Sequence, residues 1–285
     1  MSVTADSPPA RAIAELVERS RFEVLPLDGV EEQVLEHVPR DVTLTVTVSP
    51  TKGLEPSFDL VARLAGHGYG VVPHLSARLV ESRSHLGELV ARLAGLGIRD
   101  VFVVAGDATE AAGPFEGAAG LLDAMAEIGH PFEAIGIAGY PEPHPFIDEA
   151  TAAAALAAKR RHATYLASQV CFDPAVIARW VDDLWAAGTR LPVYVGVPGA
   201  VSRAKLLRVS TRIGIGDSLR FLRKQGSFVS RFLHGGFSPD PLVDGLAPLL
   251  ADPERKLAGL HVFTFNDVAD TEAWRQHRLR AGGHA

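Results

Sequence analysis

Short apolar segments alternate with helix-like segments along almost the whole chain, and this alternation constrains the fold more than any other feature. Eight segments have the length of a strand, and most are apolar throughout. Continuous apolar segments are typical of parallel strands that are covered on both faces. The expected strands are Arg21–Val24, Val42–Val48, Val71–His74, Val101–Ala105, Ala134–Ala138, Tyr165–Val170, Pro192–Gly196 and Leu260–Phe265.

Helical patterns fill the intervals between these strands. Apolar residues recur at helical spacing in His85–Leu96, and Asp173-Pro174 is typical of an N-cap followed by proline at the first helical position. Eight strands alternating with helices predict an α/β fold, a single-domain (β/α)8 TIM barrel. The alternative is a doubly wound open sheet, which is disfavoured because no G-x-G-x-x-G turn follows the first strand.

The expected barrel spans residues 21–285, and residues 1–20 form an N-terminal tail and short helix. The tail is expected to extend through Ala10. The interval Gly199–Leu260 is longer than one helix needs, so the sequence predicts extra helices between strands seven and eight. They are expected at Val201–Arg212, Asp217–Gln225 and Pro241–Leu250.

The composition disfavours several classes of function. The net charge is −6 and the longest basic run is Lys159-Arg160-Arg161, unlike the footprint of a nucleic-acid-binding protein. The single cysteine, Cys171, excludes an internal disulfide, and its apolar neighbours predict a packing role. No signal-peptide pattern and no apolar run of about 18 residues occur. We therefore expect a cytoplasmic protein without membrane or nucleic-acid partners. The sequence leaves open whether the protein forms a homo-oligomer.

Catalytic residues of a barrel lie at the carboxyl ends of its strands, where this chain has few polar residues. The loop Gly139–Pro145 stands out, because prolines and a glycine constrain a backbone that bears Tyr140, Glu142 and His144. The alternative for this loop is a proline-rich turn with incidental polar residues. The other candidates are Glu23, Ser49, His74, Asp107, Gln169, Asn266 and Asp267.

Glu23 is the strongest of these candidates. It lies within the apolar strand Arg21–Val24, and a carboxylate there is costly to bury unless it is paired or functional. Burial is expected to raise its pKa into a range suited to acid–base chemistry.

The remaining candidates have structural alternatives that the sequence leaves open. His74 fits a core histidine as well as a ligand contact, and Asp107 fits a helix cap. Gln169 either binds a ligand or hydrogen-bonds across strands, since an unpaired buried amide is costly. Asn266 and Asp267 fit a turn and a helix cap.

Six short motifs occur in order on the expected strands. They are Phe22–Pro26, Pro73–Leu75, Ala105–Asp107, Tyr140–Pro145, Gln169 with Phe172-Asp173, and His261–Asn266. In this order they resemble the motifs of the 5,10-methylenetetrahydrofolate reductase family, which are Phe-Glu-x-x-Pro, Pro-His-Leu, Arg-Gly-Asp, Tyr-Pro-Glu-x-His-Pro, Gln with Phe-Asp, and His-x-Tyr-Thr-x-Asn. The resemblance covers the chain from about Ser20 to just beyond the eighth strand.

The chain departs from this family mainly on the side of the flavin. Ala105 replaces the arginine that helps to hold FAD, and Leu156–Ala158 stands where the family has an asparagine before its basic residues. The folate side, with Glu23, Asp107 and Gln169, is retained better. The resemblance is therefore to a divergent member, of the flavin-independent actinobacterial type, in which bound FAD is doubtful.

The resemblance implies reduction of 5,10-methylenetetrahydrofolate to 5-methyltetrahydrofolate by NADH or NADPH, a step of one-carbon metabolism that serves methionine biosynthesis. Glu23 is implied as the general acid that opens the methylene bridge, and Asp107 as the group that stabilises the resulting cation. No metal is implied. Gln169, Ser49 and Phe263 are implied to contact the substrate, and His74, Tyr140, His144, Lys159 and Arg160 the dinucleotide.

Two rival functions stay open. A folate- or nucleotide-binding regulatory barrel is disfavoured because binding alone needs no acid such as Glu23. Another folate-dependent one-carbon enzyme, such as a methyltransferase, is disfavoured because the chain has no cobalamin-binding domain and no Cys/His zinc constellation.

Overall fold

The protein forms one closed barrel of eight parallel strands, in a computed structural model that describes residues 8–49, 51–143, 148–201, 237–252 and 257–283. Each strand pairs with the next in chain order, and β8 pairs with β1. The predicted (β/α)8 barrel is confirmed and the open sheet is excluded. The strands are β1 (Arg21–Val24), β2 (Thr43–Val46), β3 (Val71–Ser76), β4 (Asp100–Val104), β5 (Ala134–Gly139), β6 (Tyr165–Ser168), β7 (Val193–Pro198) and β8 (Leu257–Phe263).

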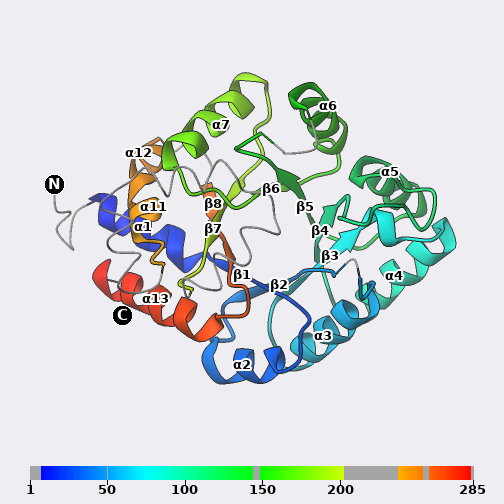
Figure 1. Ribbon diagram of the computed structural model, residues 1–285, viewed down its shortest axis with the longest axis horizontal. Helices are drawn as coiled ribbons and strands as arrows, with labels where there is room; N and C mark the ends of the chain where they lie inside the picture. Colours follow the sequence, from blue (N-terminus) through cyan, green and yellow to red (C-terminus); the bar gives the residue numbers. More distant parts are fainter. Residues whose placement is uncertain (1–7, 50, 144–147, 202–236, 253–256, 284–285) are drawn as a thin grey trace.

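The helices form a ring outside the barrel (Figure 1). Their apolar faces and the outward-facing strand residues make one hydrophobic core between the two layers. The helices are α1 (Pro8–Glu18), α2 (Val30–His37), α3 (Glu55–Gly66), the 3-10 turn η1 (Ala77–Leu79), α4 (Arg83–Gly95), α5 (Ala118–Ile128), α6 (Glu149–Lys159), α7 (Pro174–Ala186), α11 (Asp240–Gly245), α12 (Ala247–Leu250) and α13 (Val268–Ala281).

The N-terminal helix α1 packs against α13 and β8. Ile13, Leu16 and Val17 form its buried face. The helix already begins at Pro8, since proline is tolerated in a first helical turn. The expectation that the tail extends through Ala10 is therefore wrong, because residues 8–10 belong to α1.

Extra helices occur between β7 and β8, as the sequence predicts. The expected helix Pro241–Leu250 is present as two short helices, α11 and α12, that meet at Leu246. The expected helices Val201–Arg212 and Asp217–Gln225 lie outside the described residues, except for Val201, which forms an isolated bridge with Phe237.

The segment between β6 and α7 follows the sequence expectations. The Asp173 carboxylate accepts hydrogen bonds from the backbone N–H groups of Ala175 and Val176, and Pro174 opens the helix. Cys171 is fully buried, and burial raises the pKa of its thiol to about 12. It is therefore a packing residue.

The lower layer of the barrel interior is a compact cation–aromatic cluster at the amino ends of the strands. Arg21 Nη1 lies 2.9 Å from Asp100 Oδ2, and the guanidinium carbon lies 4.6 Å and 4.0 Å from the ring centroids of Tyr165 and Tyr194. A Cβ on Gly136 would lie 2.3 Å from the Tyr165 ring, so glycine leaves room for the cluster. This layer fills the barrel interior at the amino ends of the strands. A second, upper layer lies at the carboxyl ends of the strands, which form the barrel mouth.

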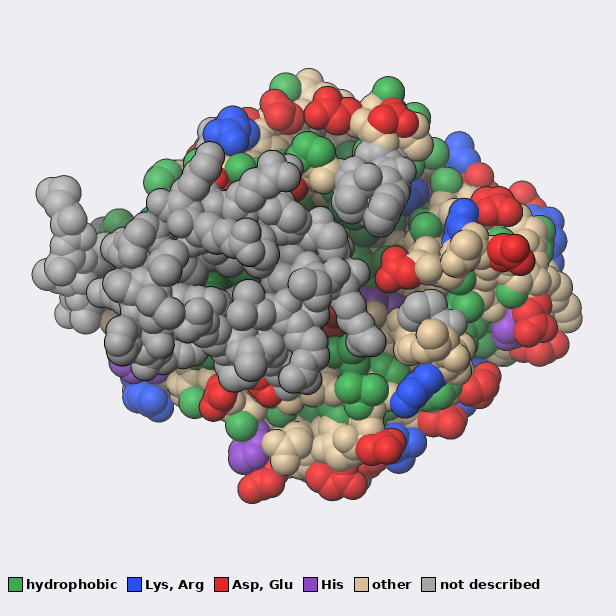
Figure 2. Space-filling model, in the orientation of Figure 1, with side chains coloured by type: hydrophobic (Ala, Val, Ile, Leu, Met, Phe, Trp, Pro, Cys, Tyr) green, Lys and Arg blue, Asp and Glu red, His purple; other side chains and the backbone are tan. Residues whose placement is uncertain are grey.

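Acidic and basic side chains are interspersed along the outer helices (Figure 2). The described part of the face in this view has no continuous patch of Lys and Arg. Of the described helices, none has the length and apolar character needed to cross a membrane.

Candidate functional site

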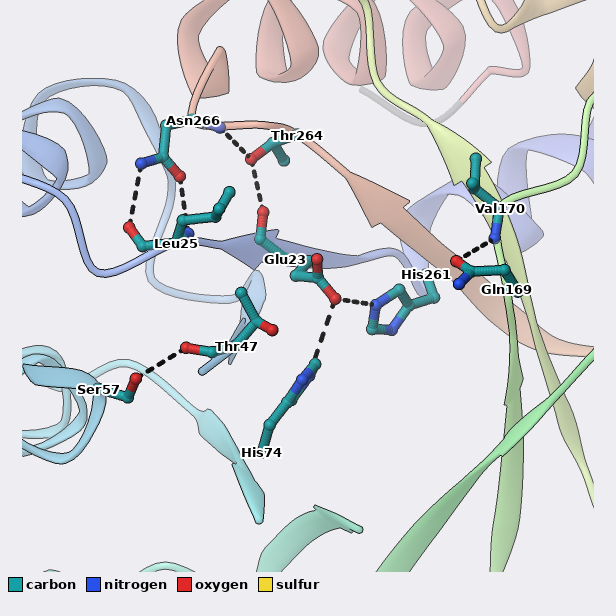
Figure 3. Close-up of polar contacts among 10 residues, drawn as sticks. All are labelled: Glu23, Leu25, Thr47, Ser57, His74, Gln169, Val170, His261, Thr264 and Asn266. Carbon is teal, nitrogen blue, oxygen red and sulfur yellow. Dashed lines mark hydrogen bonds and ion pairs between the residues drawn. The ribbon is translucent and has the colours of Figure 1, made fainter. Parts of the chain in front are cut away.

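The upper layer is built around Glu23. Strands β1 and β8 close the barrel side by side, and His261 Nε2 lies 3.0 Å from Glu23 Oε2 (Figure 3). The side chain of Glu23 keeps 14% of its exposure, against 4% for His261. The carboxylate is therefore the part of this pair that a ligand in the barrel mouth can reach.

His74 approaches the same carboxylate oxygen from β3. Its Nε2 lies 3.8 Å from Glu23 Oε2, beyond hydrogen-bonding distance, and has no other hydrogen-bond partner among the described residues. The ring lies 4.8 Å from that of Phe102, centroid to centroid. Burial lowers the pKa of His74 to about 4, so this imidazole is neutral at pH 7.

The electrostatics of Glu23 differ from the sequence expectation. Burial raises its pKa, but the hydrogen bond from His261 and the electrostatic influence of His261 and His74 outweigh burial, and the net pKa lies below the usual value. The expectation of a raised pKa is thus wrong in the free protein. Burial acts as expected, and the partners reverse its effect.

The turn after β8 fixes the backbone on both sides of Glu23. The Thr264 hydroxyl donates to the Glu23 carbonyl at 2.6 Å, and the Asn266 N–H donates to the Thr264 hydroxyl at 3.1 Å. Asn266 Oδ1 accepts from the Leu25 N–H at 2.8 Å, and Nδ2 donates to the Leu25 carbonyl at 3.0 Å. Phe265 and Asn266 adopt positive φ angles of 51° and 64° to make this turn. The structural alternative that the sequence left open for Asn266, a residue of a turn, is confirmed.

Asp107 lies exposed in the loop between β4 and α5. Gly106 before it has a φ of 90°, and a Cβ there would lie 1.8 Å from Ser76 Oγ, so only glycine fits. Burial and the charge of Asp107 raise the pKa of Tyr140. The helix-cap alternative for Asp107 is wrong, because the N-cap of α5 is Gly117.

Arg78, in η1, holds the loop that contains Asp107. Its backbone N–H donates to the Ala105 carbonyl at 3.0 Å, and its guanidinium donates to the Ala108, Thr109 and Glu116 carbonyls at 2.9 to 3.1 Å. The Glu116 carboxylate lies 3.1 Å from Nη2. An arginine from the turn that follows β3 thus organises this loop, where residue 105 itself is alanine.

Gln169 follows β6 and continues the inward-facing series of Tyr165 and Ala167. Its backbone N–H donates to the Gly139 carbonyl at 2.8 Å, and its Oε1 accepts from the Val170 N–H at 2.9 Å. Its Nε2 has no hydrogen-bond partner among the described residues, so this amide retains donors for a ligand.

The other two predicted substrate contacts differ in their surroundings. The Ser49 hydroxyl lies 3.0 Å from the Thr51 hydroxyl, and the Ser49 carbonyl accepts from the Gly53 N–H at 3.0 Å, so Ser49 shapes the turn after β2. Phe263 lies beside the acid, with its ring 4.9 Å from that of His261, centroid to centroid. Its half-buried ring offers an apolar surface at the mouth.

The predicted dinucleotide contacts that the structure describes do not gather in one place. Tyr140 is half-buried at the start of its loop, and His144 lies outside the described residues. Lys159 is buried, and its Nζ donates to the Ala138 carbonyl at 3.1 Å. Burial lowers the pKa of Lys159. Its ammonium is thus held by the protein backbone rather than presented at the rim.

Arg160 lies at the other end of the barrel from the mouth. Its Nη1 lies 3.3 Å from the Ala187 carbonyl and from the Thr189 hydroxyl, in the loop that leads into β7. The prediction that Arg160 meets a dinucleotide at the mouth is wrong, because α6 runs antiparallel to the strands and ends at their amino side.

Glu23, His74 and His261 also have the ligand types of a transition-metal site, and their donor atoms lie within 4.8 Å of one another. The absence of a metal stays a prediction, and the contact that the structure shows within this cluster is the one between His261 Nε2 and Glu23 Oε2, at 3.0 Å. The site offers a positioned carboxyl group with an aromatic wall.

Sequence reasoning missed His261, Thr264 and Arg78 as site residues. Two signals were available for the first two. His261 lies two residues before the predicted contact Phe263, hence on the same face of the strand, and Thr264 follows directly. Arg78 gave no signal, since it lies beyond the end of the expected third strand.

A (β/α)8 barrel with a partnered carboxylate in its mouth, flanked by polar residues on the ends of β4 and β6, has the architecture of a barrel enzyme. The sequence matches the family Methylenetetrahydrofolate reductase over residues 33–215. The chain belongs to this family. The matched stretch includes His74, Asp107 and Gln169, whereas β1 with Glu23 and β8 with His261 lie outside it.

Three solved structures that align with almost the whole chain have low sequence identity to it and low TM-scores. A DHPS of Yersinia pestis with a pterine–sulfa conjugate is 13% identical, at a TM-score of 0.44 over 94% of this chain and 95% of that one. A putative phosphonomutase from Burkholderia cenocepacia is 14% identical, at 0.48 over 94% and 95%. A putative lyase/mutase from the same organism is 18% identical, at 0.43 over 96% and 86%. At these scores none bears on the function of this chain.

Proposed function

We propose that this protein reduces 5,10-methylenetetrahydrofolate to 5-methyltetrahydrofolate with NADH or NADPH as the hydride donor. The observation that supports this most is the placement of Glu23, an inward-facing carboxylate that two imidazoles approach at the barrel mouth. Family membership supports a folate-related reductase, and ring opening needs a general acid, which a carboxyl group at the barrel mouth can supply.

Each residue has a distinct role in this proposal. Glu23 protonates the leaving nitrogen, so that the methylene bridge opens to an iminium cation, which hydride then converts to a methyl group. Asp107 stabilises the cation electrostatically. Gln169 hydrogen-bonds the pterin through its unbonded Nε2, and Phe263 provides an apolar wall.

Substrate binding also acts on the acid. A pterin over Glu23 excludes water from the carboxyl group, and loss of water raises the pKa of a carboxyl group. The protonated form is therefore favoured in the complex more than in the free protein, in which the imidazoles dominate.

The described residues do not fit a tightly held flavin. Ala105 has no guanidinium, Lys159 donates to a backbone carbonyl, and Arg160 lies at the opposite end of the barrel. Each missing charge-assisted hydrogen bond is worth about 1.5–3 kcal/mol. A co-substrate that binds and leaves needs fewer such contacts than a resident cofactor. We therefore propose direct transfer from NAD(P)H to the folate.

The test is an absorbance spectrum of the purified protein followed by a coupled assay. We expect no flavin band, and NAD(P)H oxidation that depends on methylenetetrahydrofolate and yields the 5-methyl product. Stoichiometric FAD released on heating would contradict direct transfer. Folate binding without any turnover would contradict the reductase and favour a regulatory barrel.

A further inference from the structure

The two carboxylate oxygens of Glu23 differ, because one of them accepts a hydrogen bond from a described residue and the other does not. Oε2 accepts from His261 at 3.0 Å and lies 3.8 Å from His74. Oε1 has no hydrogen-bond partner among the described residues. The two oxygens are therefore chemically distinct before any ligand arrives.

The same β8 segment also fixes the main chain of the acid. The Thr264 hydroxyl donates a hydrogen bond to the Glu23 carbonyl. The Asn266 side chain forms hydrogen bonds with both the N–H and the carbonyl of Leu25. His261 lies three residues before Thr264 and bonds the side chain. One segment thus holds the backbone and the carboxylate of the acid together (Figure 3).

We propose, on the basis of the proposed reductase function, that His261 is the positioning residue of the acid. Its Nε2–H holds Glu23 Oε2, directs Oε1 towards the leaving nitrogen of the substrate, and stabilises the carboxylate that proton donation leaves. In this step the Oε1–H bond breaks as the N–H bond of the substrate forms, and His261 keeps its own proton.

The surroundings of Glu23 leave this role to His261. From β3, His74 is neutral at pH 7 and too distant to bond. On β1, the next inward-facing residue, Arg21, is paired with Asp100. From β2, the register partner of Glu23 is Thr45, which is uncharged. Among the described residues, the two imidazoles are thus the charged or titratable groups that act on this carboxylate.

A pair of variants separates the hydrogen bond from the imidazole itself. Glutamine can place an N–H near the position of Nε2 but does not titrate, whereas leucine has similar bulk and no donor. For His261→Leu we expect kcat/KM to fall about 10²-fold. We also expect the alkaline limb of its pH profile to move up by about one to two units, because a hydrogen bond that favours the carboxylate is lost. For His261→Gln we expect kcat/KM to stay within about tenfold of wild type, and the alkaline limb of its pH profile to stay near the wild-type position.

The matched control is His162→Leu. His162 Nε2 lies 2.7 Å from Asp123 Oδ1 on the outer surface, so this variant removes a similar His–carboxylate contact outside the site. Its kinetics are expected to equal those of wild type. Circular dichroism and thermal unfolding establish that each variant is folded.

A ¹³C NMR titration of the Glu23 carboxyl group, without substrate, separates this proposal from the proposed function. A midpoint that moves up in His261→Leu and stays in His261→Gln supports the proposal even if no folate is reduced. Wild-type kinetics and an unmoved midpoint in folded His261→Leu would overturn it. A folded His261→Gln that is as impaired as His261→Leu would also overturn it, because the imidazole proton would then be required. If His261→Leu does not fold, His261→Ala, which also lacks a hydrogen-bond donor, takes its place in the kinetics and in the titration, with the same expected and contradicting results.

Discussion

The side-chain amide of Asn266 forms hydrogen bonds with both backbone polar groups of Leu25, at 2.8 Å and 3.0 Å, two residues beyond Glu23. This contact joins the loop after the last strand to the end of the first one, at the seam where the barrel closes. The position requires a left-handed backbone, with φ of 64°, which asparagine tolerates better than most residues.

Two substitutions at Asn266 separate the hydrogen bonds from the backbone strain. Asn266→Gly loses both bonds but tolerates the left-handed conformation, and we expect it to lower the free energy of unfolding by about 1–3 kcal/mol. Asn266→Ala loses the bonds and is also strained, so it should be about 1 kcal/mol less stable than the glycine variant. Denaturant unfolding measures both. Equal stability of alanine and glycine would contradict the strain argument.

Glu23→Gln tests the acid. Glutamine has nearly the shape of glutamate and cannot donate a carboxyl proton, so we expect turnover to fall by roughly 10²-fold or more while folate affinity stays within about tenfold. Steady-state kinetics and folate titration measure the two quantities. Glu133→Gln, at an exposed position before β5, is the control. Near-normal turnover of Glu23→Gln would remove this residue from the mechanism.

Much of the fold follows from the sequence because parallel strands covered on both faces need continuous apolar residues. The range expected for β1, Arg21–Val24, equals the observed one, and the other strands differ by a few residues at their ends. The ends are less predictable, since they depend on hydrogen bonding with neighbouring strands rather than on apolar character.

The site was less predictable than the fold, because its contacts join distant segments. Glu23 was evident as a carboxylate in an apolar strand, but its partner His261 lies 238 residues away and meets it only when the barrel closes. The two imidazoles then reverse the expected direction of its pKa shift. Arg160 was misplaced for a different reason: proximity to the fifth strand in sequence does not give proximity to its carboxyl end, because the intervening helix runs back along the barrel.

Gln169→Ala tests recognition of the pterin. Loss of a buried hydrogen bond is worth about 1–3 kcal/mol, so folate affinity should fall by about fivefold to 150-fold. The KM for NAD(P)H should stay unchanged. Binding titrations with each ligand measure this, and Gln33→Ala on the exposed face of α2 is the control. An effect confined to the nicotinamide would show that the folate contact is misassigned.

Chelation tests the prediction that the cluster of Glu23, His74 and His261 holds no metal. Because His261 already bonds the carboxylate, we expect turnover after prolonged dialysis against EDTA to stay within about twofold of the untreated protein. Elemental analysis before and after dialysis accompanies the assay. Loss of activity that a divalent ion restores would identify the cluster as a metal centre instead.

Arg78→Lys tests how the protein places Asp107. The guanidinium bonds three carbonyls and one carboxylate across the loop 105–116, and a lysine ammonium cannot reproduce this fork. We expect kcat to fall about tenfold, because Asp107 is then less well positioned against the developing cation. The KM for folate should change little.

Stability and proteolysis complete the test of Arg78. The guanidinium side chain keeps 28% of its exposure, so we expect a loss of only about 1 kcal/mol in the free energy of unfolding. Limited proteolysis should cut the loop 105–116 faster than in wild type, because its backbone has lost its anchor. Arg92→Lys is the matched control, since Arg92 also bonds two carboxylates, those of Glu55 and Asp59, but on the outer helices. If kcat is unchanged in Arg78→Lys although the loop is cut faster, Asp107 does not act in the rate-limiting chemistry.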